Sequence, residues 1–222
     1  MSERPLVDWG WIADHTDDIV AQLAEHLWLT VLAVVIGFCI SLPLAILAYR
    51  RKRFYGPITW VTGVLYTIPS LALFVLLIPF TGLSVLSAEI GLVSYTLLIL
   101  IRNTVAGLAS VSEDVKEAAT AMGMTRRGLL WRVELPLAVP AIVAGLRIAT
   151  VTTIGLVTVT AFIGQGGLGR FILLGLKTFF STATLLGASL SVALALTAEG
   201  LFLTLQRRLV PWARTSGRRE AR

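Results

Sequence analysis

Five long apolar stretches dominate the chain and are separated by short polar segments. They cover about residues 26–49, 57–78, 86–108, 137–163 and 182–205. Each is long enough to cross a bilayer as a helix, which takes about 20 apolar residues. Ile19, Leu23 and Leu27 recur at helical spacing around the start of the first stretch and predict an amphipathic lead-in helix. The pattern therefore predicts an all-α integral membrane protein with about five transmembrane helices.

The second stretch carries a proline and two hydroxyl groups in its middle. Pro69 lacks a backbone N–H and leaves a carbonyl of the preceding turn unpaired, which the side chain of Thr67 or Ser70 can bind. Interrupted helices occur at membrane depth where they line a pathway, and prolines also produce simple kinks. We therefore predict either a pathway lining or a structural kink at Thr67, Pro69 and Ser70.

The fourth stretch is the most polar of the five, because it contains five threonines between Thr150 and Thr160. Together with Gly145 and Gly155, these threonines suit close helix packing as well as pore lining. Thr158 and Thr160 accordingly join the three residues of the second stretch as candidates for a translocation pathway.

A charged segment over residues 109–136 separates the third and fourth stretches. Residues 113–122 are rich in Glu and Ala, which predicts a helix. Gly123 is a natural helix stop, and residues 125–132 predict a second short helix before a new segment starts near Pro136. The segment is thus expected to form a helix–turn–helix elbow outside the bilayer.

Two smaller segments follow the fourth stretch. The run Gly164-Gln165-Gly166-Gly167-Leu168-Gly169 predicts a turn, and residues 170–180 predict a short interfacial helix. The glycine run resembles a nucleotide-binding loop only superficially, because no parallel βαβ unit surrounds it. We therefore expect no phosphate binding there.

Composition supports the membrane assignment. The 222 residues are 56% hydrophobic and 14% charged, with a mean hydropathy of +0.82, whereas a soluble domain is about half apolar and a quarter charged. A net charge of +6 would suggest a nucleic-acid partner in a soluble protein. Here the cations lie at the ends of the spans, so topology explains them and we expect no nucleic acid. One transmembrane domain over residues 19–205 accounts for most of the chain.

Lysine and arginine are distributed unevenly over the two sides of the spans. Fifteen of them follow the first span, follow the third span or lie in the tail, whereas three lie on the other side and Arg147 lies within a span. Positively charged residues stay cytoplasmic. The N-terminus is therefore expected outside and the C-terminus inside. This makes residues 1–18 an extracytoplasmic segment, the elbow cytoplasmic, and residues 206–222 a basic, disordered cytoplasmic tail.

Few residues indicate chemistry at a site. Arg147 is the one charge within the fourth stretch, and Glu199 lies near the end of the fifth. A charge in a span marks a functional site by default, but Arg147 lies close enough to the basic side for a packing or loop contact. His15 and His26 are the only histidines, lack partners for a metal site and are expected at the membrane interface. None of the three lysines lies in a P-loop, so we expect no metal, no cofactor and no enzymatic activity in this chain.

The elbow resembles a known motif. Glu117-Ala118-Ala119, Gly123 and, after nine further residues, Val133-Glu134-Leu135-Pro136 match the cytoplasmic loop of permease subunits in binding-protein-dependent ABC importers. The resemblance implies the type I ABC importer permease fold, with the elbow docked in a groove of an ATPase subunit. The implied coupling residues are Glu117, Ala118, Ala119, Gly123, Met124, Leu135 and Pro136.

Further segments narrow the resemblance to one branch. Residues 67–73, 102–104, 123–125, 131–136 and 163–169 are similar to importers of glycine betaine, choline, carnitine or proline betaine. The resemblance extends over about residues 25–205. It implies two ATP-binding subunits, a second permease chain that is identical or paralogous, and an extracytoplasmic substrate-binding protein. An importer for methionine or another small solute, and a membrane scaffold or sensor that binds an ATPase, remain as alternatives.

Overall fold

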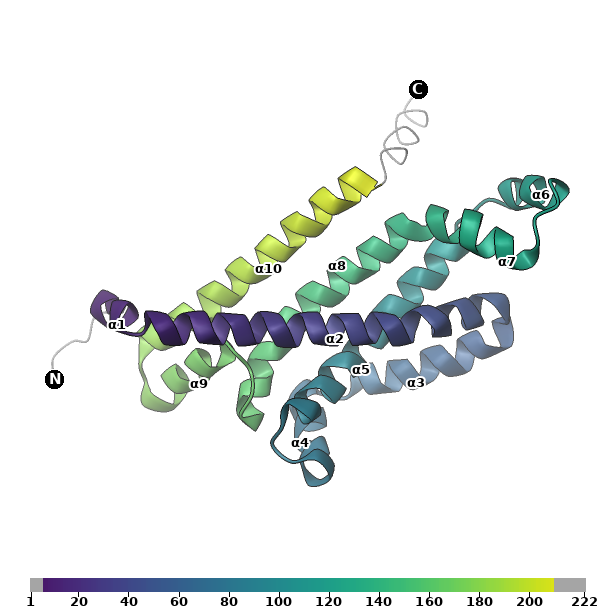
Figure 1. The fold of residues 1–222 in the computed structure, drawn as a ribbon. Coiled ribbons are helices and arrows are strands. Elements are labelled where there is room, and N and C mark those ends of the chain that lie inside the picture. The colour runs from purple at the N-terminus through teal and green to yellow at the C-terminus, as the bar shows by residue number, and fades with distance from the viewer. Residues whose placement is uncertain (1–5, 210–222) are drawn as a thin grey trace.

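The computed structural model describes residues 6–209, and every regular element in that range is helical. Four long helices run lengthwise through the protein (Figure 1). They are α2 (Thr16–Arg50), α5 (Val85–Ala109), α8 (Leu135–Val159) and α10 (Ser181–Leu209). Helix α2 contacts both α5 and α8. With 35 residues, it is about 52 Å long at 1.5 Å per residue and extends from one end of the molecule to the other.

Shorter helices connect the long ones and form the two ends. They are α1 (Trp9–Asp14), α3 (Tyr55–Thr67), α4 (Ser70–Thr81), α6 (Glu113–Ala121), α7 (Arg126–Leu129) and α9 (Gly169–Thr178). Short 3₁₀ turns lie at η1 (Lys52–Phe54) and η3 (Thr160–Ile163), and a wider π-helical turn lies at η2 (Leu130–Glu134). Helices α6 and α7 form one end of the molecule, and α1 and α9 lie at the opposite end (Figure 1).

Four helices in the described part of the chain are long and apolar enough to cross a membrane. The second apolar stretch differs, because the helices Lys52–Thr67 and Ser70–Thr81 meet at an angle of 97°. The interruption or kink predicted at Pro69 is therefore confirmed, as a sharp break between two helices. Pro69 ends the hydrogen-bond ladder and Ile68 before it is extended, with ψ of 128°, so the chain turns there. Counted as one broken span, this pair is the fifth.

Small residues bring α5 and α8 into close contact. A Cβ on Gly107 would lie 2.7 Å from the Cβ of Ala141, and a Cβ on Gly145 would lie 2.7 Å from the Cβ of Asn103. Lipid chains are as apolar as the helix surfaces, so apolar burial gives little driving force for association within a bilayer. Close van der Waals contact of this kind therefore holds the two spans together.

Two buried clusters support the two halves of the molecule. The larger one lies where α2, α4, α5 and α8 meet. It consists of Leu29, Ala33, Phe74, Ala88, Leu92, Val93, Val157 and Ile163. The smaller one lies beside the elbow and consists of Leu108, Leu130, Ala138 and Ile142. The broken helix pair and the elbow each rest on a packed core.

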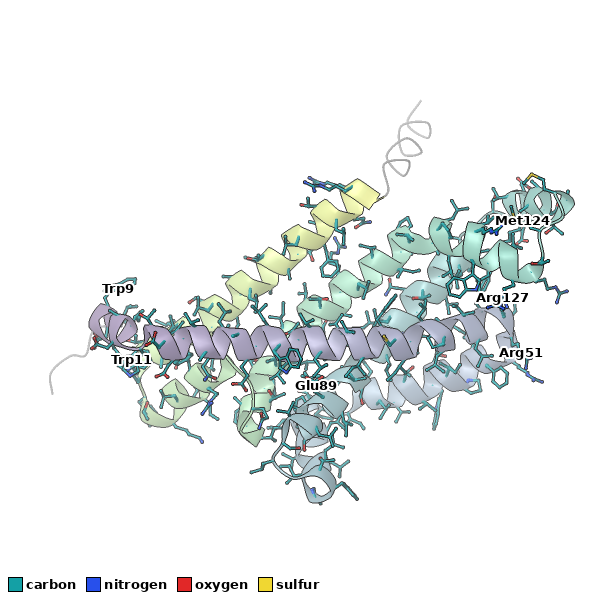
Figure 2. The ribbon with its side chains drawn as sticks, viewed as in Figure 1. Trp9, Trp11, Arg51, Glu89, Met124 and Arg127 are labelled. Carbon is teal, nitrogen blue, oxygen red and sulfur yellow. The ribbon has the colours of Figure 1, made fainter. Side chains whose placement is uncertain are left out.

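The N-terminal segment packs on the turn between α9 and α10. The Asp8 N–H donates to Thr182 Oγ1 at 2.9 Å, and Ser181 Oγ donates to the Leu6 carbonyl at 3.0 Å. The Trp11 and Phe180 rings pack edge to face, with their centroids 5.2 Å apart. Figure 2 shows Trp9 and Trp11 at this end. Helix α1 thus covers the end of the bundle opposite the elbow.

Two expectations about the ends of the spans are wrong. His26 was expected at the interface but is fully buried, with Nε2 3.1 Å from the Ile154 carbonyl, because α8 covers this turn of α2. Helix α10 continues to Leu209, so residues 206–209 of the predicted tail are helical and not disordered. The rest of the predicted tail, residues 210–222, lies outside the described residues. The lead-in helix, in contrast, is confirmed as the first part of α2.

Candidate coupling and translocation sites

Local sequence builds the first helix of the elbow. The Ser112 side chain caps α6 by accepting a hydrogen bond from the Val115 N–H at 3.4 Å. Lys116 Nζ donates to Glu113 Oε1 at 2.9 Å. This bond raises the pKa of Lys116 above its ordinary value, so its ammonium group is charged at neutral pH. The predicted helix over residues 113–122 is confirmed to within one residue.

Gly123 ends α6 in the left-handed conformation, with φ of +83°. Its N–H donates to the Thr120 carbonyl at 2.9 Å, and the Met124 N–H donates to the Ala119 carbonyl at 3.2 Å. The two bonds form a Schellman motif, which satisfies carbonyls at a helix end. A side chain here would be strained by the positive φ, although no neighbouring atom lies within 4 Å of a Cβ. The predicted helix stop is confirmed.

The second helix of the elbow runs directly into the fourth span. Thr125 Oγ1 caps α7 by accepting from the Gly128 N–H at 3.2 Å, and the chain continues through η2 into α8. In the π-helical turn η2, the Leu135 N–H donates to the Leu130 carbonyl. This wider turn accommodates Pro136, which has no N–H to continue the ordinary ladder. The expected second helix and the start of a new segment near Pro136 are present, but no break separates them.

The expected coupling residues differ in exposure. Glu117, Ala118, Gly123 and Pro136 are exposed, Met124 and Leu135 are half-buried, and Ala119 is buried. Ala119 is 3% exposed because α6 packs against α7 and η2, so it faces its own chain. Met122, which the sequence did not single out, is 73% exposed. Figure 2 shows Met124 and Arg127 at this end of the molecule. The exposed surface of the elbow tip therefore combines small and apolar residues with the carboxylate of Glu117 and the neighbouring Arg126 and Arg127.

At the break between α3 and α4, two hydroxyl groups bind free carbonyls. Thr67 Oγ1 donates to the Val64 carbonyl at 2.8 Å, as the sequence suggested. The Ile68 carbonyl is bound by the hydroxyl of Tyr95 on α5, and Ser70 does not take this role. Sequence reasoning missed Tyr95 because it lies 27 residues away on another helix.

The candidate pathway residues differ in how exposed they are. Thr67 is exposed and lines an open cavity of about 640 Å³ together with Trp60, Tyr66 and Arg102. Thr160 is fully buried in η3, and its hydroxyl donates to the Val157 carbonyl at 2.8 Å. Pro69 is exposed, whereas Ser70 and Thr158 are half-buried. Because α4 contacts η3, the structure brings the second and fourth stretches together.

Two charges within the spans form an ion pair that sequence reasoning did not predict. Arg147 Nη1 of α8 lies 3.1 Å from Glu199 Oε1 of α10, and the two side chains are 26% and 39% exposed. The sequence left open whether Arg147 is functional or makes a packing contact. The structure shows a helix–helix contact in which each charge offsets the cost of placing the other within a span.

The chain is similar to known proteins over most of its length. The family described as "Binding-protein-dependent transport system inner membrane component" matches residues 37–212, which include the elbow, the broken helix pair and the glycine run. The chain belongs to this family. This permease is therefore an inner-membrane component of a transport system that works with a binding protein, in agreement with its apolar helices.

The curated relatives of the permease are transport proteins of similar length. It is 33% identical to the choline transport system permease protein of Bacillus subtilis over 87% of this chain and 89% of that protein. It is 37% identical to a carnitine transport permease protein of Listeria monocytogenes (88% and 90% covered). It is 36% identical to the osmoprotectant import permease protein of Salmonella typhimurium (90% and 96% covered).

Solved structures establish the fold of the permease. A chain of the inward-facing MetNI methionine ABC transporter superposes with a TM-score of 0.81 at 24% identity, covering 88% of this chain and 98% of that one. A chain of an amino acid ABC transporter superposes with a TM-score of 0.73 at 24% identity, covering 91% and 99%. The expected type I ABC importer permease fold is confirmed.

Proposed function

We propose that this permease is the membrane subunit of an ATP-driven importer for osmoprotectants, namely glycine betaine, choline, carnitine or proline betaine. One observation carries the proposal: identities of 32–37% over 87–90% of the chain with permeases named for choline, glycine betaine, carnitine or osmoprotectant transport. The methionine alternative has weaker support, because its structural relatives are 24% identical, a level that supports the fold alone.

The proposed importer contains two permease chains, identical or paralogous, two ATPase subunits and an extracytoplasmic binding protein. ATP is hydrolysed on the ATPase subunits, and this chain catalyses no reaction. The exposed elbow tip, with Glu117, Ala118, Met122 and Gly123, docks in the ATPase, while Ala119 packs beneath it. Because α7 continues into α8, a displacement of the tip moves the fourth span. ATP binding then opens the pathway outward, and hydrolysis returns it inward.

We further propose the orientation that the charge distribution favours. Residues 1–18 lie outside, the transmembrane domain covers residues 19–205, the elbow (109–136) faces the cytoplasm, and residues 206–222 form a cytoplasmic tail. Cations concentrate at the elbow end of the bundle, which supports a cytoplasmic location for that end.

Uptake measurements test the solute class. The permease is expressed with its ATPase and binding-protein partners in a host that lacks its own osmoprotectant uptake. We expect ATP-dependent accumulation of radiolabelled choline, glycine betaine or carnitine, and no accumulation of methionine. Accumulation of methionine alone would exclude the osmoprotectant proposal, and ATPase binding without uptake of any solute would favour a scaffold or sensor.

A substitution tests docking at the elbow. Gly123→Trp places a large ring in the open space at the tip, so we expect it to prevent close contact with the ATPase and to abolish uptake while the protein still inserts. Gly82→Trp is the matched control, because Gly82 also has a positive φ (+70°) and open space around its Cα but lies between α4 and α5. Unchanged uptake by Gly123→Trp would show that the elbow tip does not dock.

A further inference from the structure

The last turn of α2 is attached to the elbow by two hydrogen bonds. The Tyr49 hydroxyl donates to Glu134 Oε1 at 2.8 Å, and Arg50 Nη2 donates to the Arg126 carbonyl at 2.9 Å. Arg126 is the first residue of α7 and Glu134 is the last residue of η2. Both ends of the α7–η2 segment are therefore fixed to the same helix. Figure 2 shows Arg51, the next residue, at this end of the molecule with Arg127.

Tyr49 also contacts the first helix of the elbow. Lys116 Nζ of α6 lies 5.7 Å from the centroid of the Tyr49 ring, within the range of a cation–π interaction. The same ammonium group is held at 2.9 Å by Glu113 on its own helix. One tyrosine of α2 thus touches both arms of the elbow.

The Tyr49–Glu134 bond is partly buried, because its acceptor lies inside the protein. Glu134 is 6% exposed, and the second buried cluster, with Leu108, Leu130 and Ala138, lies beside it. A buried carboxylate without a hydrogen-bond partner is strongly unfavourable, and a bond to a charged acceptor is stronger than one between neutral groups. This contact therefore restrains the movement of α2 relative to η2 more strongly than an exposed pair would.

The opposite half of α2 is attached to the glycine run. Glu25 Oε1 accepts from the Gly166 N–H at 3.2 Å. A Cβ on Gly167 would lie 2.6 Å from the Gln22 carbonyl oxygen, so backbone meets backbone there. Glu25 and Tyr49 are separated by about 36 Å along a continuous helix at 1.5 Å per residue. One helix therefore connects the elbow to the loop at the other end of the bundle.

We infer that Tyr49, Arg50 and Lys116, here called the α2 clamp, are positioning residues that make α2 move together with the elbow. The covalent chain joins the elbow to α5 and α8, and the clamp adds α2 as a third helix. A displacement imposed by the ATPase then reaches the glycine run at residues 164–169 along α2. The inference rests on the proposed function, in which the elbow receives that displacement.

A distance measurement on the permease alone tests the clamp directly. Cys39 is replaced by Ser, and spin labels are attached at Ile40→Cys on α2 and Met122→Cys on the elbow, both of which are exposed. We expect a narrow distance distribution that broadens in Tyr49→Phe/Arg50→Ala. Tyr55→Phe is the matched control, since the Tyr55 hydroxyl has no hydrogen-bond partner within residues 6–209. Equal widths in all three proteins would overturn the inference.

Coupling in the complete transporter provides the functional test. In proteoliposomes we expect Tyr49→Phe to raise the ATP hydrolysed per solute imported by about tenfold, the size of one hydrogen bond to a charged group. Glu134→Gln keeps an acceptor oxygen, so its ratio of ATP hydrolysed to solute imported should stay near that of the parent. Glu134→Leu should raise this ratio as much as Tyr49→Phe does. A ratio in Tyr49→Phe equal to that of Tyr55→Phe would refute the clamp. If the parent imports no solute, the proposed function fails, and the label distances still decide whether the clamp exists.

Discussion

At the scale of single residues, polar groups inside the spans need protein partners because lipid offers none. Tyr95 is 6% exposed and supplies a hydroxyl to the Ile68 carbonyl, which the break at Pro69 leaves free. Arg147 and Glu199 provide a partner for each other between α8 and α10. These side chains stabilise the arrangement of helices, so their removal is expected to lower the free energy of unfolding.

Tyr95→Phe is expected to lower stability by about 1–3 kcal/mol, because a buried carbonyl loses its partner while the ring is kept. The measurement is thermal unfolding of the purified permease in detergent. Tyr66→Phe serves as the control, since Tyr66 packs edge-on against Tyr95 and its hydroxyl has no hydrogen-bond partner among residues 6–209. An equal loss in the two variants would mean that the Ile68 bond contributes nothing.

Arg147→Glu is expected to destabilise the permease by about 1–3 kcal/mol, between the values for exposed and buried pairs, because it places two carboxylates together. Exchanging the charges in Arg147→Glu/Glu199→Arg should recover most of that loss. Unfolding temperatures of the parent, Arg147→Glu, Glu199→Arg and the double exchange give the double-mutant comparison. If the exchange recovers nothing, the pair does not hold α8 to α10.

At the scale of elements, two segments join parts that hydropathy treats as separate. The π-helical turn η2 makes the elbow and the fourth span one continuous helix over Arg126–Ile163. The glycine run packs its backbone directly on α2, with Gly166 and Gly167 in positive-φ conformations. The glycine run depends on positive φ angles that favour glycine, and η2 is next to Pro136, which lacks an N–H.

Gly167→Ala should destabilise the permease much more than Gly164→Ala. Both positions have positive φ, which costs an alanine about 1–2 kcal/mol. A Cβ on Gly167 would in addition lie 2.6 Å from α2 backbone, whereas nothing lies within 4 Å of one on Gly164. Unfolding temperature and hydrogen exchange over residues 160–170 report the difference. Equal effects would show that the loop separates from α2 at little cost.

At the scale of the whole molecule, the bundle has two chemically different ends. The elbow end carries the cations that follow the first and third spans, and the opposite end carries α1 and α9 with the acidic N-terminal segment. The long helices that could cross a membrane run between these two ends (Figure 1). The proposed transport mechanism requires the elbow to face the cytoplasm.

Cysteine labelling determines this orientation. In a Cys39→Ser background, Lys177→Cys on α9 should react with an impermeant maleimide in intact cells, because it is exposed at the end that the proposed orientation places outside. Met122→Cys should react only after the membrane is permeabilised. Labelling of Met122→Cys in intact cells would show that the orientation is the reverse of the proposed one, and would exclude ATPase docking at the elbow.

Much of this architecture follows from the sequence alone. Hydropathy located the spans, because the transfer of a helix into lipid depends on its own composition. Helix propensity and Gly123 located α6 and its Schellman end, because capping is a contact between residues a few positions apart. The break at Pro69 was located in the same way, since proline removes a donor wherever it stands.

Only the tertiary structure decided which distant groups meet. Nothing near Ile68 in sequence points to Tyr95, Arg147 gives no sign of Glu199, and Tyr49 gives no sign of Glu134. The 97° turn at Pro69, the burial of Ala119 and the continuity of α7 with α8 were likewise invisible. Periodicity states which face of a helix is apolar, whereas the pairing of faces depends on how closely whole helices can approach one another.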